Sequence, residues 1–233
     1  MSRVRTAGEL LGPGGLRRVR WWALAGVIVL TALLSIAWFT PALAVRTIEI
    51  NGISAIPEEQ VRERLDIPEG LSLMRIDTVA MAERVAAIAK VRSAKVERVY
   101  PSTVRVTVDE RRAVLWFDAP EGAHLLDRDA VEFAVEPPPI GLPQLVTDRP
   151  GGADELTRAA VTVVNALPPA LNIQVEQVLA RSISDISLRL ADGRTVMWGA
   201  ADDAERKAAV VLPLLTREGT VFDVSSPNLV TVK

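Results

Sequence analysis

The sequence predicts an α+β protein behind a single N-terminal transmembrane helix, and three features of the chain lead to this prediction. Residues 21–39 contain no charged side chain over nineteen positions, and a bilayer core takes about 20 apolar residues to cross. Residues 45–112 pass through strand, helix, helix, strand and strand patterns in that order. Residues 113–233 mix short alternating stretches with longer helical ones, which favours a second α+β domain with an antiparallel-rich sheet.

The charges around the apolar stretch predict its orientation. Residues 1–20 form a short tail with five arginines and a single acid, Glu9. Because positive charge beside a span stays in the cytoplasm, we expect a single-pass helix over 21–40 in the cytoplasmic membrane, with the rest of the chain outside. Tryptophans at both ends of the stretch are typical of interfacial membrane anchors, and these are Trp21, Trp22 and Trp38.

Two alternatives to a simple uncleaved anchor stay open. Ala42, Leu43 and Ala44 have the small-residue spacing of a signal-peptidase site. The apolar stretch, however, exceeds the roughly 7–15 residues of a signal-peptide core. Small side chains within the stretch would also let a second helix approach closely, namely Ala25, Gly26, Ala32 and Ser35.

The composition excludes several classes of function. The chain has no cysteine, so it has no disulfide, thiolate metal ligand or thiol nucleophile. Its formal net charge of −2 falls to −6 when the basic tail is left out, which argues against a nucleic-acid partner. No group of residues has metal-ligand spacing and no glycine-rich phosphate loop follows a strand, so we expect no metal and no cofactor.

The first exported region has a clear order of elements. Alternation over 45–50 predicts a strand that ends at Asn51 and Gly52. Pro57 begins a helix with acids in its first turn, and Asp77 is the expected N-cap of a second helix that runs to about Ala89. Strands over 91–99 and 103–110 follow. Two helices would then cover one face of a three-stranded sheet.

The second region is predicted with less regular patterns. Proline residues 137–139 form a stiff connector, Pro168 and Pro169 stop a helix, and Pro213 is expected to kink the last helix. The expected strands are 114–117, 124–126, 131–135, 175–179, 183–190 and 195–198, the expected helices are 154–167 and 202–219, and an extended segment covers 220–232.

The first region resembles a POTRA domain. The resemblance rests on VRTIEING at 45–52, the loop GLSL at 70–73 and VERVYPSTVRVTVDERR at 96–112. A POTRA domain directly after one membrane anchor, followed by a mixed domain, resembles the FtsQ/DivIB family of bacterial cell-division proteins. This layout implies a cytoplasmic tail at 1–20, a span at 21–40, a POTRA domain at 45–112, an FtsQ-type domain at 113–224 and a terminal edge segment at 225–233.

Downstream stretches extend the resemblance. The stretch LLDRDAV at 125–131 is similar to the family's Asp-x-x-Gly-Val hairpin, with Ala130 in place of the glycine. Leu142-Pro143, the helix pattern over 207–215 and the strand pattern over 221–224 are also similar to family elements. Ala113 replaces a proline that often follows the third POTRA strand.

The resemblance implies a protein that binds other proteins and has no enzymatic activity. In this family a terminal strand takes up a segment of an FtsB/DivIC-type protein, and FtsL-type proteins, septal peptidoglycan synthases and FtsK are further partners at the division septum. Edges of the POTRA sheet, at 48–50 or 91–96, form a second candidate surface. The alternative that the terminal apolar residues belong to the core stays open. The implied partner-binding residues are Val221, Phe222, Asp223, Val224, Leu229, Val230, Thr231 and Val232.

Other functions find little support. His124 is the only histidine, so a serine triad has one possible base, and Ser93 with Lys95 makes no dyad by proximity alone. A generic exported POTRA module that assists translocation or assembly is the main alternative function. A sugar-binding domain would need exposed aromatic side chains, and only Trp116 and Trp198 are available as tryptophans after the span.

Overall fold

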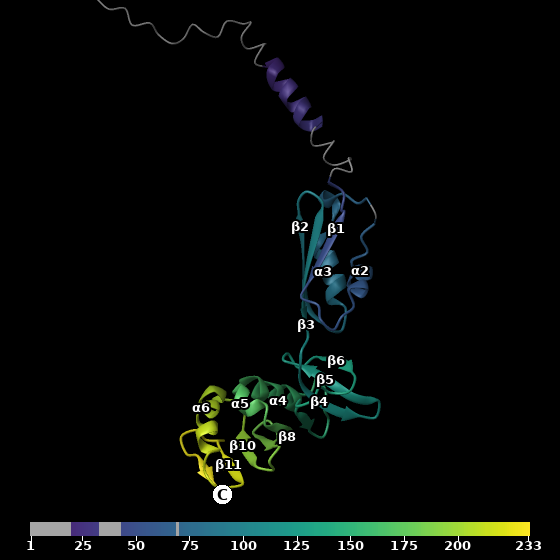
Figure 1. Ribbon diagram of the computed structural model, residues 1–233. Coiled ribbons are helices and arrows are strands. Elements are labelled where there is room, and N and C mark those ends of the chain that lie inside the picture. Colours follow the sequence, from purple (N-terminus) through teal and green to yellow (C-terminus); the bar gives the residue numbers. More distant parts are fainter. Residues whose placement is uncertain (1–19, 33–42, 69) are drawn as a thin grey trace, which may run out of the picture. The chain divides into compact units, whose positions relative to one another are not determined.

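The computed structural model describes residues 20–32, 43–68 and 70–233. The chain divides into two compact units (Figure 1). The first unit contains Met1–Ala87 and Ser93–Asp109, and the second contains Ile88–Arg92 and Glu110–Lys233.

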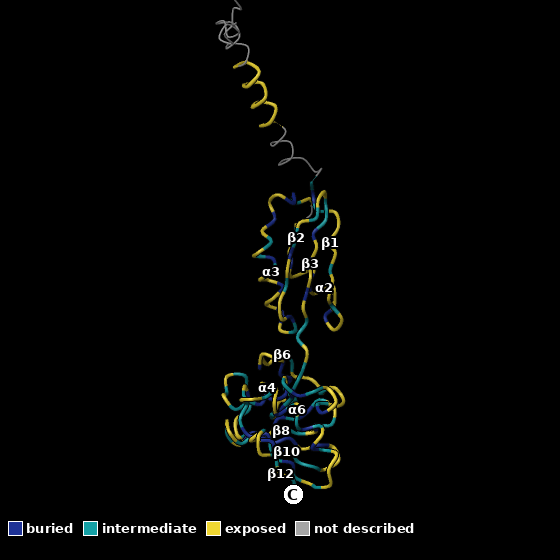
Figure 2. Tube along the Cα trace, turned by 90° about the vertical axis from the view of Figure 1, so that its left-hand side faces the viewer, coloured by how far each residue is buried: buried dark blue, intermediate teal, exposed yellow. Residues whose placement is uncertain are grey.

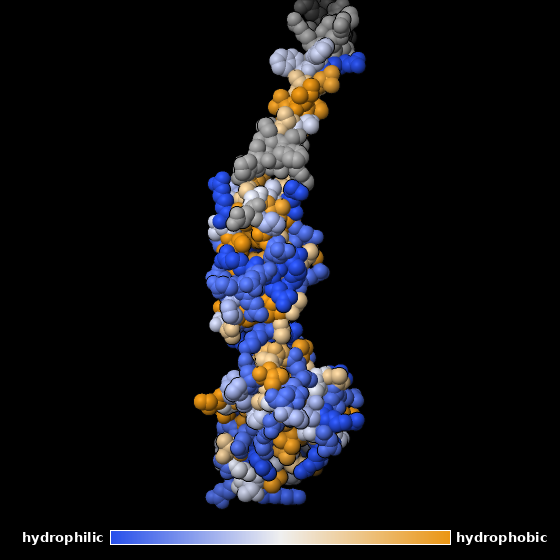
Figure 3. Space-filling model, turned by 90° about the vertical axis from the view of Figure 1, so that its right-hand side faces the viewer, coloured by the Kyte–Doolittle hydropathy of each residue, from blue (hydrophilic) through white to orange (hydrophobic). Residues whose placement is uncertain are grey.

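A helix covers residues 20–32, and most of its side chains are hydrophobic (Figure 3). Within the described residues, no helix has both the length and the apolar character needed to cross a bilayer. The first part of the predicted span over 21–40 lies in this helix, and the remainder of the span, with Trp38, lies outside the described residues.

The first unit has the predicted order of elements. β1 pairs with β3 in parallel, and the sheet order is β1-β3-β2. Val104, Val106 and Val108 are buried while the residues between them are exposed, so one face of the sheet packs against the helices. The elements are β1 (Thr47–Asn51), α2 (Glu58–Leu65), η2 (Leu73–Arg75), α3 (Thr78–Ala86), β2 (Val91–Val99) and β3 (Thr103–Glu110).

Local capping explains where two of these elements begin. The carboxylate of Asp77 accepts hydrogen bonds from the amides of Val79 and Ala80, both at 3.1 Å, which confirms the predicted N-cap of α3. The short 3₁₀ helix η2 was not predicted. Its cap is Ser72, whose side chain accepts a hydrogen bond from the amide of Met74.

The second unit is built on a nine-stranded mixed sheet with the order β12-β11-β10-β9-β8-β7-β4-β5-β6. Pairs β4–β7, β7–β8 and β10–β11 are parallel, and the others are antiparallel. The elements are β4 (Ala113–Ala119), β5 (Gly122–Asp127), β6 (Glu132–Val135), β7 (Gln144–Val146), α4 (Glu155–Ala166), α5 (Pro169–Asn172), β8 (Val175–Ser182), β9 (Asp185–Leu190), β10 (Thr195–Gly199), α6 (Ala204–Leu214), β11 (Val221–Asp223) and β12 (Thr231–Val232).

One hydrophobic core supports this sheet (Figure 2). Helix α4 packs on β4 and β8 and contacts α6. Trp198 of β10, Phe222 of β11 and Val211 of α6 are fully buried in the same cluster. The core therefore reaches to the last strands of the sheet.

Four details of the second unit differ from the prediction. The last helix ends at Leu214, one residue after Pro213, rather than bending there and continuing to Gly219. Strand β7 was not predicted, and α5 begins at Pro169, where a proline suits the first helical turn. The extended segment at 220–232 forms two antiparallel strands joined by a turn.

Candidate partner-binding site

Strand β12 forms one edge of the nine-stranded sheet. The prediction that residues 221–224 form an open edge is wrong, because β11 lies between β10 and β12. The side chains of Phe222 and Val224 have no exposed surface, so they contribute to the core. The edge of the sheet within the predicted site is therefore formed by the segment that follows β11.

Hydrogen bonding shows which backbone groups of β12 face outward. Lys233 donates to the carbonyl of Val221 at 2.9 Å and accepts from its amide at 3.0 Å, so Lys233 points its backbone groups toward β11. Backbone groups alternate in direction along an antiparallel strand. The N–H and C=O of Val232 therefore point away from β11, and those of Val230 follow the same alternation.

Close packing holds the terminal strand in place. A Cβ added at Gly219 would lie closer than 3.0 Å to the side chain of Val232. A Cβ added at Gly199, where φ is +77°, would lie 2.8 Å from the Cβ of Ser225. Both glycines therefore permit close approach to the segment after β11.

The turn before β12 is ordered by local hydrogen bonds. Asp223 accepts from the amide and the hydroxyl of Ser225 at 2.9 and 2.6 Å. Leu229 donates its amide to the carbonyl of Ser226 at 2.9 Å, yet its side chain is 75% exposed. Of the predicted site residues, Leu229 and Thr231 are exposed, and Val221, Asp223, Val230 and Val232 are half-buried.

Arg194, in the turn between β9 and β10, contacts Phe222 of β11. Its guanidinium carbon lies 5.6 Å from the centroid of the Phe222 ring, a distance suited to cation–π contact. It also donates to the carbonyl of Leu215 at 2.7 Å and to the carboxylate of Asp192 at 2.6 Å. The backbone N–H of Arg194, together with its side chain, holds the pKa of Asp192 below its ordinary value.

Lys207 fixes the start of α6 beside the same strands. Its side chain is almost fully buried, and Nζ donates to the carbonyl of Ala200 at 2.9 Å and to Asp202 at 3.0 Å. Sequence reasoning assigned roles to neither Arg194 nor Lys207, because long cations are usually exposed.

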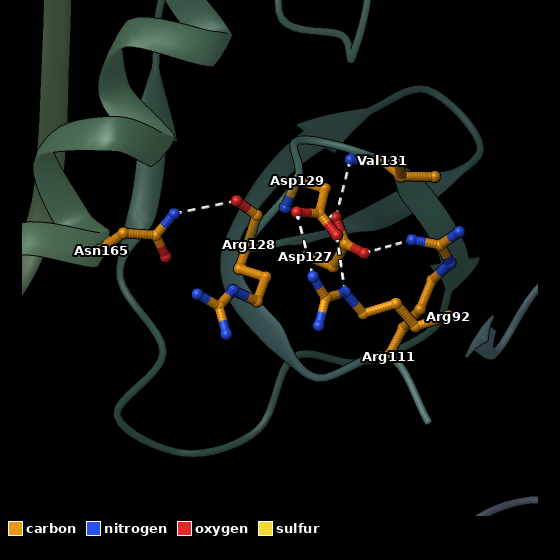
Figure 4. Close-up of polar contacts among 7 residues, drawn as sticks. All are labelled: Arg92, Arg111, Asp127, Arg128, Asp129, Val131 and Asn165. Atoms are coloured by element: carbon orange, nitrogen blue, oxygen red, sulfur yellow. Dashed lines mark hydrogen bonds and ion pairs between the residues drawn. The ribbon is translucent and has the colours of Figure 1, made fainter. Parts of the chain in front are cut away.

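A second polar cluster supports the β5–β6 turn (Figure 4). The buried carboxylate of Asp127 accepts from the amides of Asp129 and Val131, both at 2.9 Å, and from the guanidinium of Arg111. Arg92 donates to Asp129 at 2.7 Å and lowers the pKa of that carboxyl. Ala130 adopts φ +59°, so the turn forms although the family's glycine is missing.

The two side chains considered for catalysis, those of His124 and Lys95, contact neighbouring side chains. The Nδ1 atom of His124 lies 3.1 Å from Glu132, and its ring stacks on Phe117 with centroids 4.9 Å apart. Lys95 forms an ion pair with Glu97 at 2.8 Å. Across residues 20–32, 43–68 and 70–233, no group of three or more histidines and acids is placed to hold a metal ion.

The structure also gives the exposure of four tryptophans and the strands that carry the candidate POTRA edges. Trp198 is fully buried, and Trp116 is half-buried with its Nε1 donating to the carbonyl of Leu142 at 3.1 Å. Trp21 and Trp22 are exposed on the N-terminal helix. The two candidate POTRA edges lie on β1 and β2, the outer strands of the first sheet; binding at either one stays a prediction.

The chain matches known proteins along most of its length. Residues 43–111 match the POTRA domain of FtsQ type, and residues 114–230 match the C-terminal domain of the cell division protein FtsQ/DivIB. The cell division protein FtsQ of Mycolicibacterium smegmatis is 45% identical over 219 residues, which cover 94% of this chain and 66% of that protein. The FtsQ of Mycobacterium tuberculosis is 46% identical over 196 residues, which cover 84% of this chain and 62% of the relative.

A shorter relative is covered almost completely. The FtsQ of Corynebacterium glutamicum is 33% identical over 211 residues, which cover 89% of this chain and 95% of that protein. The chain thus spans about two thirds of the length of the mycobacterial relatives and nearly all of the corynebacterial one. With both domain models matched in the predicted order, the chain belongs to the FtsQ/DivIB family of bacterial cell-division proteins.

Proposed function

We propose that this protein is a non-enzymatic scaffold of the division machinery, held in the cytoplasmic membrane by one span over 21–40. Its exported domains bind FtsB/DivIC-type and FtsL-type single-span proteins at the septum and thereby help to recruit or regulate septal peptidoglycan synthesis. FtsK and the septal synthases are further proposed partners. The tryptophans Trp21, Trp22 and Trp38 anchor the span at the two interfaces.

The observation that carries this proposal is the outer edge of β12. The N–H and C=O of Val232 face away from the sheet, and an extended partner segment would satisfy both by strand addition. Thr231 and Leu229 present exposed side chains next to this edge, so they would contact alternate side chains of the partner. The buried residues Phe222 and Val224 act by holding the edge in place.

A substitution at the edge tests the proposal. Val232→Pro removes an outward N–H while leaving the bonds between Lys233 and Val221 intact, and Val232→Ala trims the side chain but keeps that N–H. One net hydrogen bond is worth about 1 kcal/mol, so we expect the proline variant to bind an FtsB-type exported segment about fivefold more weakly than the alanine variant. The measurement is titration of the full chain in lipid nanodiscs with the labelled segment.

A control comes from the opposite edge of the same sheet. Glu136 donates its amide to the carbonyl of Ala123, so the backbone groups of Val135 face outward by alternation. Val135→Pro should leave the affinity unchanged. Equal binding by the two Val232 variants would contradict strand addition at β12. It would favour the alternative function, a generic exported POTRA module that assists translocation or assembly.

A further inference from the structure

The end of the first unit at which the chain begins its first strand carries an unusual set of exposed side chains. Val45 donates its amide to the carbonyl of Leu71, and Arg46 donates to the carbonyl of Ser102, both at 2.9 Å. β1 and β3 are parallel, with Thr47 beside Thr103. The start of β1, the η2 segment and the β2–β3 turn therefore meet at one end of the unit.

We call the exposed residues at this end the N-terminal rim. Tyr100 is 58% exposed and Met74 is 41% exposed, and the Tyr100 hydroxyl lies 3.4 Å from the Met74 sulfur. Met74 is followed directly by Arg75. The rim consists of Arg46, Met74, Arg75, Tyr100 and Pro101, all of which are exposed.

The charge of the rim differs from that of the exported part as a whole. Arg46 and Arg75 form no ion pair with another described residue. Arg98 adds a third cation nearby, since its guanidinium donates to the carbonyl of Ile76. The acid closest in sequence to Arg75 among the described residues is Asp77, which keeps its negative charge while it caps α3. Three arginines (Arg46, Arg75 and Arg98) against this one acid leave the rim locally positive, although the residues after the tail carry a net charge of −6.

This inference rests on the membrane span of the proposed function. The few residues between that span and the first strand keep the rim close to the bilayer surface. Ala44 follows Phe39, the last residue of the uncharged stretch, by five positions. Five residues reach at most about 18 Å, and the headgroup layer itself is about 5–7 Å deep on each side. Tyrosine and long cations are the side chains that favour this layer.

We propose that the N-terminal rim is a lipid-contact surface that docks the POTRA domain on the headgroups of an anionic bilayer. Arg46 and Arg75 contact lipid phosphates, while Tyr100 and Met74 insert at the level of the headgroups. This contact limits how the POTRA domain tilts relative to the bilayer, and so sets the height of that domain above the membrane.

The test uses the full chain in liposomes of phosphatidylcholine with and without phosphatidylglycerol. Because the chain has no cysteine, a single introduced cysteine labels one site with a fluorophore. Thr47→Cys reports on the rim, and Thr107→Cys is the matched control at an exposed threonine about 13 Å further along the sheet. Lipids with a nitroxide on the headgroup quench a fluorophore that lies at the bilayer surface.

We expect stronger quenching at position 47 than at 107, and only when phosphatidylglycerol is present at low salt. Each arginine near an anionic surface favours contact about fivefold, so Arg46→Gln with Arg75→Gln should weaken docking about thirtyfold and remove the difference between the two probes. Arg158→Gln with Arg206→Gln makes the same charge change in the second unit and should leave the quenching at 47 as it is.

Four results would overturn the proposal, the last of them together with the proposed membrane anchor. Equal quenching at 47 and 107 excludes docking by the rim, and so does quenching that survives loss of both arginines. Protection of the cysteine at position 47 from labelling in cell membranes, but not in protein-free liposomes, would indicate that a protein partner covers this site instead of lipid. A fluorophore at Leu24→Cys, tested with nitroxides on the lipid acyl chains, distinguishes failure of the rim from failure of the membrane anchor. If this fluorophore is quenched, the anchor holds whatever the rim does. If it is not quenched, the proposed membrane anchor fails together with the rim.

Discussion

Gly219→Ala tests how the terminal strand is held. An added Cβ at Gly219 would lie closer than 3.0 Å to the Val232 side chain and 3.1 Å from the carbonyl oxygen of Lys233, and the backbone there has φ +151°. Gly219 lies in the loop two residues before β11, and Val232 belongs to β12. Movement of β12 away from β11 would relieve the collision between them. We expect the alanine variant to release β12 and leave the remaining strands paired.

The hydrogen bonds of Lys233 determine the size of the effect. Its carbonyl accepts from Thr220 and Val221 at 2.8 and 3.0 Å, and its amide donates to Val221 at 2.9 Å. Three hydrogen bonds at about 1 kcal/mol each amount to roughly 3 kcal/mol, which corresponds to an increase of about a hundredfold in local opening. Hydrogen–deuterium exchange of the full chain, read over residues 219–233, measures this opening directly.

Gly193 provides the matched control. It also has a positive φ, +88°, but a Cβ there would meet no atom within 4 Å. Gly193→Ala should therefore lower global stability by about 1 kcal/mol through backbone strain and leave the exchange over 219–233 unchanged. Unchanged exchange in Gly219→Ala would refute the packing argument, and equal acceleration in both variants would assign the effect to strain instead.

Two further predictions concern the polar clusters of the second unit. Asp127→Ala leaves the Arg111 guanidinium and two backbone amides without their acceptor, so we expect a loss of about 3 kcal/mol in unfolding free energy, measured by urea denaturation, with Asp127→Asn milder because it keeps an acceptor. Asp129 and Asp192 have pKa values below the ordinary one, so the stability they contribute is present above about pH 4 and is lost as the pH falls through their lowered values. The difference in urea midpoint between the native protein and Asp129→Asn should accordingly shrink with acidification below about pH 4, and a constant difference would speak against the Arg92 contact as its cause.

Local patterns predicted most of the first unit because its signals lie within a few residues of each other. Valines at every second position over 103–110 and a carboxylate at Asp77 act over short distances, and both were confirmed. The η2 segment escaped prediction because a three-residue 3₁₀ helix has too few positions to show a period. Its Ser72 cap is visible in sequence only once the helix is known.

The second unit was less predictable because neighbouring strands decide its outcome. β7 has three residues, and its identity comes from parallel pairing on both sides, with β4 and β8. The alternation of Val221, Phe222 and Asp223 correctly predicts a strand, but an alternating pattern contains no information about which strand lies at the edge. Burial of Phe222 and the close approach at Gly219 depend on residues 225–233 folding back, which is a tertiary property.

The two edges of the large sheet differ in a way that favours β12 as the open one. On β6, the position after outward-facing Val135 on the same side is Pro137, and a proline has no N–H to offer a partner. Prolines at 137–139 therefore protect this edge against added strands, as natural sheets commonly do. On β12, outward-facing positions are Val230 and Val232, which keep their amides. On β6 the outward N–H of Val135 is followed by prolines, whereas β12 offers the amides of both Val230 and Val232. This asymmetry favours β12 over β6 as the edge for the proposed strand addition.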